Sequence, residues 1–198
     1  MPQSDHSKKN KKHIGILGGA FNPAHHGHLY ISEKALEILS LDEIWWLVSY
    51  KHPTKKNTHN DNNFAERIKY ASDLIKKHNK IKISNFEQIS VTSYTIDTLN
   101  LMIQRYPNHQ LIWIMGEDNL INFHTWYNWQ EIIKLIPILI VSREHNAGSY
   151  LNSKFYQLFK EYQTFEINEF KNKSNLAWYY LNIPVNTISS SKIRDNNI

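Results

Sequence analysis

Short apolar runs with little polar interruption alternate with amphipathic segments along this chain, and this alternation constrains the fold more than any other feature. Continuous apolar strands separated by helices are typical of a parallel sheet that helices cover on both faces. We therefore expect a single-domain α/β fold with a doubly wound, Rossmann-like parallel sheet. The expected strands cover 13–17, 43–49, 81–84, 111–115, 138–141 and 176–181, and the expected helices cover 27–39, 64–75, 95–105, 129–135 and 150–162.

Length and charge divide the chain into a leader and one domain. At the usual ~100–200 residues per domain, 198 residues form one domain. Residues 1–12 hold four of the 23 Lys and Arg residues and one of the 18 Asp and Glu residues, so the net charge falls from +5 to +2 without them. We expect residues 1–12 to be a disordered, Lys-rich leader and residues 13–198 to form the domain. This mildly basic domain suits a small anionic substrate as well as a polymer.

Cysteine usage and hydropathy exclude several protein classes. The chain has no cysteine, which excludes disulfide scaffolds, thiolate zinc sites, iron–sulfur clusters and cysteine nucleophiles. The apolar run Leu135–Val141 is far shorter than the ~18 residues that a membrane span needs, and Met1–Lys12 has no apolar signal segment. We therefore expect a cytoplasmic protein without a membrane partner. The sequence leaves its oligomeric state open.

The segment Gly18–His28, after the first expected strand, contains the strongest candidates for binding and catalysis. Gly18 and Gly19 permit a tight turn, and the N–H groups that begin the next helix can bind an anion. His25 and His28 are three residues apart, so both can donate to phosphate oxygens. The dinucleotide pattern Gly-x-Gly-x-x-Gly and the Walker pattern are absent. The alternatives are a glycine-rich turn with incidental histidines, or a zinc site that lacks a third ligand at an obvious spacing.

A serine-rich segment near the C-terminus is a second candidate phosphate site. Ser189–Ser191 precede Lys192 and Arg194. If a helix begins at Ser190, its N-terminus can bind an anion and Arg194 can bind phosphate through two N–H groups. The alternative is a serine-rich cap on a terminal helix.

Polar and aromatic residues also follow the strand expected at 111–115. Asp118 can hold a ribose hydroxyl at the end of this strand, and Trp126 can stack on a flat heteroaromatic ring. The alternative for Trp126 and Trp129 is core packing, which we expect for at least one of them.

Taken together, these segments resemble one family. Gly-Gly-x-Phe-Asn-Pro-x-His-x-Gly-His at 18–28 and Ile-Ser-Ser-Ser-x-Ile-Arg at 188–194 resemble the nucleotidyltransferase superfamily with the His-x-Gly-His signature. Three further motifs are similar to those of bacterial nicotinate-nucleotide adenylyltransferases: Ser93–Leu99, Met115–Asn119 and Phe123–Trp129. The resemblance spans roughly residues 13–194.

The resemblance implies adenylyl transfer from ATP to nicotinate mononucleotide, which gives deamido-NAD and pyrophosphate in NAD biosynthesis. The mononucleotide phosphate would attack the α-phosphorus of ATP directly and in line, without a covalent enzyme intermediate. Catalysis would then consist of positioning and charge neutralisation, and Mg²⁺ would enter with the ATP phosphates. The implied partners are these two nucleotides, without a nucleic acid.

The resemblance also implies roles for individual residues. The catalytic residues would be His25, His28 and Arg194, with His28 nearest the α-phosphate. The ATP-binding residues would be Gly18, Gly19, Phe21, His25, His28, Ser190, Ser191 and Arg194. The mononucleotide-binding residues would be Thr92, Asp118, Trp126, Tyr127, Lys55 and Arg67. Among these, Trp126 would stack on the pyridine ring, the Tyr127 N–H would bind the ring carboxylate, and Lys55 and Arg67 would contact the phosphate.

Four features depart from the family pattern. Asn22 stands where most members have aspartate, and Ser191 stands where threonine is commoner. Residues 51–56 are an unusual version of the basic loop. The chain ends at Ile198, which leaves little length for the closing helix that members usually have after Arg194.

Other functions stay open on the sequence alone. Another superfamily member would act on phosphopantetheine or a polyol phosphate, and a nearer relative would prefer nicotinamide mononucleotide. From other classes, the chain could be a nucleic-acid-binding module that uses its Lys-rich leader, or a nucleotide sensor without catalysis. No RNA-binding signature or recognition-helix pattern favours the nucleic-acid module.

Overall fold

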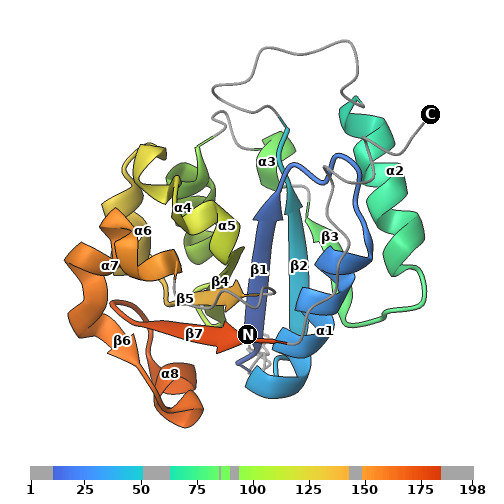
Figure 1. The fold of residues 1–198 in the computed structure, drawn as a ribbon. Coiled ribbons are helices and arrows are strands. Elements are labelled where there is room, and N and C mark those ends of the chain that lie inside the picture. Colours follow the sequence, from blue (N-terminus) through green and yellow to red (C-terminus); the bar gives the residue numbers. More distant parts are fainter. Residues whose placement is uncertain (1–10, 51–62, 85, 90–93, 143–148, 184–198) are drawn as a thin grey trace, which may run out of the picture.

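Seven parallel strands form one sheet in the computed structural model, which describes residues 11–50, 63–84, 86–89, 94–142 and 149–183 (Figure 1). The strands lie in the order β3-β2-β1-β4-β5-β7-β6, and each neighbouring pair is parallel. Their bounds are β1 His13–Gly19, β2 Glu43–Val48, β3 Ile81–Ser84, β4 Gln110–Gly116, β5 Ile138–Ser142, β6 Gln163–Thr164 and β7 Trp178–Asn182.

Helices cover both faces of this sheet. One face carries α1 (His26–Leu39), α2 (Phe64–Ile75) and α8 (Ile167–Asn172). The other face carries α4 (Thr95–Arg105), α6 (Trp129–Leu135) and α7 (Lys154–Phe159). Shorter elements are α3 (Phe86–Ile89), α5 (Glu117–Leu120) and the 3₁₀ turns η1 (Phe123–Thr125), η2 (Ser149–Asn152) and η3 (Lys160–Tyr162). Among the helices described, none is long and apolar enough to cross a membrane.

Strand β4 contributes side chains to the hydrophobic cores on both faces of the sheet. Its side chains alternate, so that Ile112 and Ile114 enter the core under α1 and α2, whereas Trp113 and Met115 enter the core under α4 and α6. Because both faces are buried, the strand reads as a continuous apolar run. The expected doubly wound α/β fold is confirmed.

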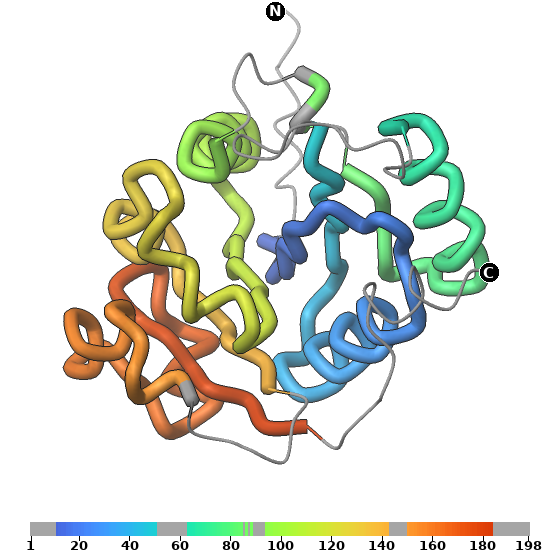
Figure 2. Tube along the Cα trace, turned by 45° about the horizontal axis from the view of Figure 1, so that its top comes forward, coloured from blue at the N-terminus to red at the C-terminus, as the bar shows by residue number. Residues whose placement is uncertain are grey.

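The strand order reverses between β1 and β4. From β1 the chain winds outward through β2 to β3, and from β4 it winds the other way through β5 and β7. Figure 2 shows the two halves on either side of β1 and β4. Ligands of such sheets bind beyond the carboxyl ends of the strands at this reversal. The loops after β1 and β4 therefore form the candidate site.

Three expected elements were wrong in extent by two or more residues. The strand expected over 13–17 continues to Gly19, so Gly18 and Gly19 end β1 instead of forming the turn after it. The helix expected over 150–162 is divided at Ser153, whose hydroxyl accepts a hydrogen bond from the Tyr156 N–H (3.1 Å) and so begins the separate helix α7. The strand expected from residue 176 begins only at Trp178, because Leu176 has a φ of 46°, which lies outside the extended region.

Candidate active site

Helix α1 begins with a cap that two histidines make for each other. The Nδ1 of His25 accepts a hydrogen bond from the Gly27 N–H (3.0 Å), and the Nδ1 of His28 accepts one from the His25 N–H (3.3 Å). The two ring centroids are 3.9 Å apart. Since Nδ1 accepts in both rings, each neutral ring carries its proton on Nε2. The cap therefore makes both histidines Nε2–H donors.

Phe21 in the loop after β1, Trp46 of β2 and Ser32 of α1 hold His28 in place. Phe21 is fully buried, and its ring centroid lies 4.6 Å from that of His28 and 4.9 Å from that of Trp46. Its φ of 47° is unfavourable for phenylalanine, and these ring contacts stabilise it. The Trp46 Nε1–H donates to the Ser32 hydroxyl (2.8 Å), which donates to the His28 carbonyl oxygen (2.9 Å). Both the ring and the backbone of His28 are thus fixed.

Trp113 of β4 connects the carboxyl end of β1 to the aromatic residues after β4. A Cβ atom on Gly18 would collide with the Trp113 indole, so the ring packs directly against the Gly18 backbone. The same indole contacts Trp126 edge to face, with 6.2 Å between centroids. A Cβ on Gly19 would lie 3.4 Å from the Phe21 ring. The segments 18–28 and 123–129, both identified from the sequence, therefore both contact the buried side chain of Trp113.

Asp118 lies in α5, just past the end of β4, and Trp126 follows the turn η1. Asp118 is exposed, and its carboxylate folds back over Gly116, where a Cβ atom would collide with Oδ1. Trp126 is half-buried and also packs edge to face on Phe123, with 5.1 Å between centroids. Both side chains thus lie beside the switch point of the sheet.

Two neighbours of Trp126 differ in their surroundings. Tyr127 is exposed, and its ring centroid lies 4.5 Å from that of Tyr94, at the start of α4. Trp129 packs on Phe123 and Phe159, with centroid distances of 5.7 and 5.8 Å. Trp129 thus belongs to the packing under α6 and α7.

Arg67 lies between two loops. It is 9% exposed, and its guanidinium group donates to the carbonyl oxygens of Ala20 (2.6 Å) and Tyr50 (3.4 Å). Its Cζ atom also lies 5.4 Å from the centroid of the Phe64 ring. Arg67 therefore ties the loop after β1 to the loop after β2, a role that the sequence did not reveal.

Five expected site residues lie outside the described residues, namely Lys55, Thr92, Ser190, Ser191 and Arg194. Conversely, sequence reasoning missed Ser32, Trp46 and Glu117. A serine four positions after His28 was the one available signal for Ser32, because residues four apart share a helix face.

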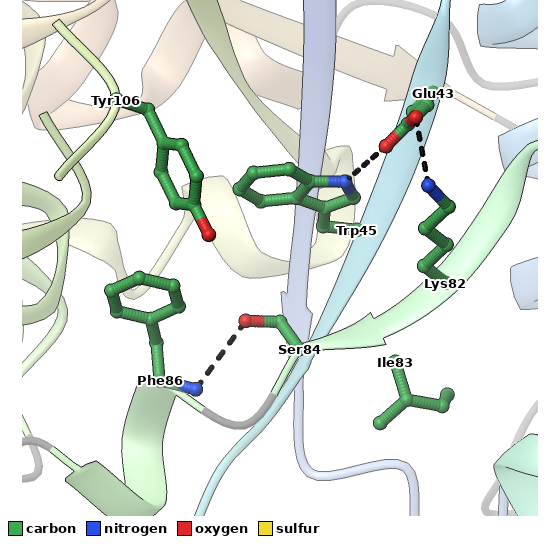
Figure 3. A pocket seen from close by; sticks show the side chains of 7 residues that line it. All are labelled: Glu43, Trp45, Lys82, Ile83, Ser84, Phe86 and Tyr106. Carbon is green, nitrogen blue, oxygen red and sulfur yellow. Dashed lines mark hydrogen bonds and ion pairs between the residues drawn. The ribbon is translucent and has the colours of Figure 1, made fainter.

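A hollow of about 280 Å³ lies along the edge strand β3 and its neighbour β2 (Figure 3). Its polar wall is Glu43, which accepts hydrogen bonds from Lys82 (2.8 Å) and from the Trp45 Nε1–H (2.8 Å). Burial alone would raise the pKa of Glu43, but hydrogen bonds from Lys12, Lys82 and Trp45 outweigh burial and lower it to about 2. We assign this ion cluster a structural role and no part in the chemistry.

Comparisons with known proteins agree with the motifs and the switch-point geometry. The chain belongs to the cytidylyltransferase-like family, which matches residues 16–196. Within it, the chain is similar to two proteins named "Probable nicotinate-nucleotide adenylyltransferase". That of Ruegeria sp. (strain TM1040) is 34% identical over 183 residues, covering 91% of this chain and 95% of the relative. That of Agrobacterium fabrum (strain C58) is 36% identical over 186 residues, covering 92% and 98%.

A solved structure also shares the fold. Plasmodium falciparum nicotinic acid mononucleotide adenylyltransferase, complexed with NaAD, superposes with a TM-score of 0.68 at 23% identity. The match covers 93% of this chain and 83% of that protein.

Proposed function

We propose that this chain transfers the adenylyl group of ATP to nicotinate mononucleotide, which yields deamido-NAD and pyrophosphate for NAD biosynthesis. The main structural support for this proposal is the cap of α1, in which His25 and His28 each accept a backbone hydrogen bond through Nδ1. It sets two Nε2–H donors at the N-terminus of a 14-residue helix at the switch point of the sheet. The names and identities of the curated relatives support the same activity. Both substrates are nucleotides of the cytoplasm, where we propose that the enzyme works.

The proposed reaction is a direct displacement at phosphorus. A phosphate oxygen of the mononucleotide forms a bond to the α-phosphorus of ATP, while the bond from that phosphorus to the leaving pyrophosphate oxygen breaks on the opposite side. His28 would donate to the α-phosphate oxygens and His25 to a neighbouring phosphate, with the dipole of α1 adding positive potential. Because the cap already orients both rings, these donors need little reorganisation during the reaction. Ser190, Ser191 and Arg194 would hold the β- and γ-phosphates.

The loops after β4 and β2 would hold the mononucleotide. Asp118 would accept a hydrogen bond from a ribose hydroxyl, and Trp126 would stack on the pyridine ring. The Tyr127 N–H, with Thr92, would bind the ring carboxylate. Lys55 and Arg67 would contact the phosphate, and Arg67 would also hold the loop after β1 through the Ala20 carbonyl.

Mg²⁺ would enter as the complex with ATP. This ion typically keeps several waters and binds substrate phosphates rather than a closed cage of protein ligands. In the part of the chain that the structure describes, no three His, Asp or Glu side chains gather as potential metal ligands. We propose phosphate oxygens and water as its ligands, with the metal neutralising charge on the leaving pyrophosphate.

A pyrophosphate-release assay tests the proposed function. The assay supplies ATP with nicotinate mononucleotide, nicotinamide mononucleotide or phosphopantetheine, and CTP with a polyol phosphate. We expect kcat/KM to be at least about tenfold higher with nicotinate mononucleotide than with its amide, because a site built for the carboxylate leaves its donors unpaired against the amide.

Three results would contradict the proposal. Equal kcat/KM values for the acid and the amide would overturn the substrate assignment. ATP binding without pyrophosphate release from any acceptor would favour a nucleotide sensor. RNA affinity that disappears on deletion of residues 1–12, without adenylyl transfer, would favour a nucleic-acid-binding module.

A further inference from the structure

Glu117 is a buried acidic residue beside the candidate site, and the proposed chemistry does not use it. It is 8% exposed, although it directly precedes the exposed Asp118. Its Oε1 accepts a hydrogen bond from the Tyr150 N–H (3.1 Å) in η2, and its Oε2 accepts one from the Tyr180 O–H (2.8 Å) in β7. Burial, together with the Glu117 side chain, raises the pKa of Tyr180 to about 12, so this hydroxyl stays a donor at neutral pH. Glu117 thus joins the end of β4 to two distant segments.

Helix α5 is too short to fix its own orientation. It contains four residues, and a helix of this length is not stable through its own hydrogen bonds. Glu117 and Leu120 are buried and three positions apart, so they share the inner face, whereas Asp118 and Asn119 are exposed. The rotation of α5 about its axis is therefore set by its two inward side chains. Leu120 packs without directional preference, whereas the hydrogen bonds of Glu117 are directional.

The Asp118 carboxylate depends on this rotation. Its Oδ1 lies so close to Gly116 that a Cβ atom there would collide with it, so the carboxylate is folded back over the end of β4. Rotation of α5 would carry the carboxylate away from this position, and with it the acceptor that we propose for the ribose.

We infer that Glu117 is a positioning residue for the mononucleotide site, because it fixes α5, and hence the Asp118 carboxylate, through hydrogen bonds to η2 and β7. This inference rests on the proposed function.

Two substitutions of Glu117 test the inference, with KM measured separately for each substrate. Glu117→Ala leaves the Tyr150 N–H and the Tyr180 O–H without this acceptor, and we expect KM for nicotinate mononucleotide to rise about tenfold or more. KM for ATP should stay within about twofold. Glu117→Gln should keep both KM values within about twofold of wild type, because its amide oxygen accepts from the Tyr150 N–H and its N–H₂ can donate to the Tyr180 oxygen.

A matched control and a milder variant complete the test. Glu43 is also 8% exposed and hydrogen-bonded, but it lies at the start of β2. Glu43→Ala should lower the melting temperature and leave both KM values unchanged. Should Glu117→Ala fail to fold, Tyr180→Phe removes one of the two hydrogen bonds and should still raise KM for the mononucleotide about threefold.

Several outcomes would overturn the inference. They are equal increases in both KM values, a lowered melting temperature with an unchanged KM for the mononucleotide, and a glutamine variant that behaves like alanine. An unchanged KM in Tyr180→Phe would do the same if Glu117→Ala did not fold. A failure of the proposed function looks different, because wild-type enzyme would then release no pyrophosphate with nicotinate mononucleotide.

Discussion

At the scale of residues, His28 combines a folding role with a catalytic one. Its Nδ1 closes the cap of α1, and its Nε2–H is the donor that we propose for the α-phosphate. We expect His28→Ala to lower kcat by roughly 10²–10³ while the Kd for ATP changes much less, because the lost donor acts mainly on charge that grows in the transition state. Steady-state kinetics and an ATP titration measure the two effects.

His26 provides the control for this substitution. It is an exposed histidine in the same turn, so His26→Ala should retain kcat. An effect of His28→Ala confined to KM would remove His28 from the proposed role.

Alanine substitution should have different effects at Gly116 and at Gly18, because the new Cβ atom would meet a substrate-binding carboxylate at the first and a core indole at the second. At Gly116 the φ of −72° suits alanine, but the new Cβ would collide with the Asp118 Oδ1 and displace the carboxylate. We expect Gly116→Ala to lower kcat/KM for the mononucleotide about tenfold with little change in melting temperature.

At Gly18 the new Cβ would meet the buried Trp113 indole, which cannot move aside, so Gly18→Ala should destabilise the fold by about 1–3 kcal/mol.

Kinetics and thermal unfolding of the two variants measure this difference. A Gly116→Ala enzyme with unchanged kcat/KM would show that the position of the Asp118 carboxylate does not matter for substrate binding.

At the scale of elements, Glu43 holds together the amino ends of three strands. It begins β2, and it pairs with Lys12 before β1 (2.6 Å) and with Lys82 in β3 (2.8 Å). The pKa of Glu43 falls from the ordinary 4.5 to about 2, which corresponds to at most ~3 kcal/mol. The real contribution is smaller, because both lysines are about half exposed and screened by solvent.

This depressed pKa gives a pH dependence of defined sign. The stabilisation is complete above the unfolded pKa of 4.5 and is lost as pH falls toward the folded value of about 2. The difference in unfolding free energy between wild type and Glu43→Gln should therefore shrink between about pH 5 and pH 2. Urea unfolding at several pH values measures it, and a difference that stays constant over this range would show that Glu43 does not contribute through its charge.

The elements themselves differ in how well the sequence predicts them. Helices α4 and α6 have the bounds expected from their apolar periodicity, which extends over two turns or more. Helices α3 and α5 have four residues each, too few for a period to appear. The breaks at Ser153 and Leu176 depend on one side-chain hydrogen bond and one backbone angle, and apolar patterning carries neither.

At the scale of the whole molecule, the candidate site could be predicted where its residues are close in sequence. The glycines and histidines of 18–28 form one motif, and Asp118 and Trp126 follow one strand. The supporting residues could not be predicted, because their partners are distant: 14 positions separate Ser32 from Trp46, and 63 separate Glu117 from Tyr180. Such pairs are brought together by the packing of α1 on the sheet and by the order of the strands.

The claim that the cap of α1 presents two Nε2–H donors to ATP can be measured directly by ¹⁵N NMR of the imidazole rings at pH 8. We expect His25 and His28 to carry the proton on Nε2 with Nδ1 unprotonated, and their Nε2 resonances to shift when Mg²⁺ and a non-hydrolysable ATP analogue are added, while those of His26 stay in place. Protonation on Nδ1 in either ring, or Nε2 resonances that the nucleotide leaves unchanged, would contradict it.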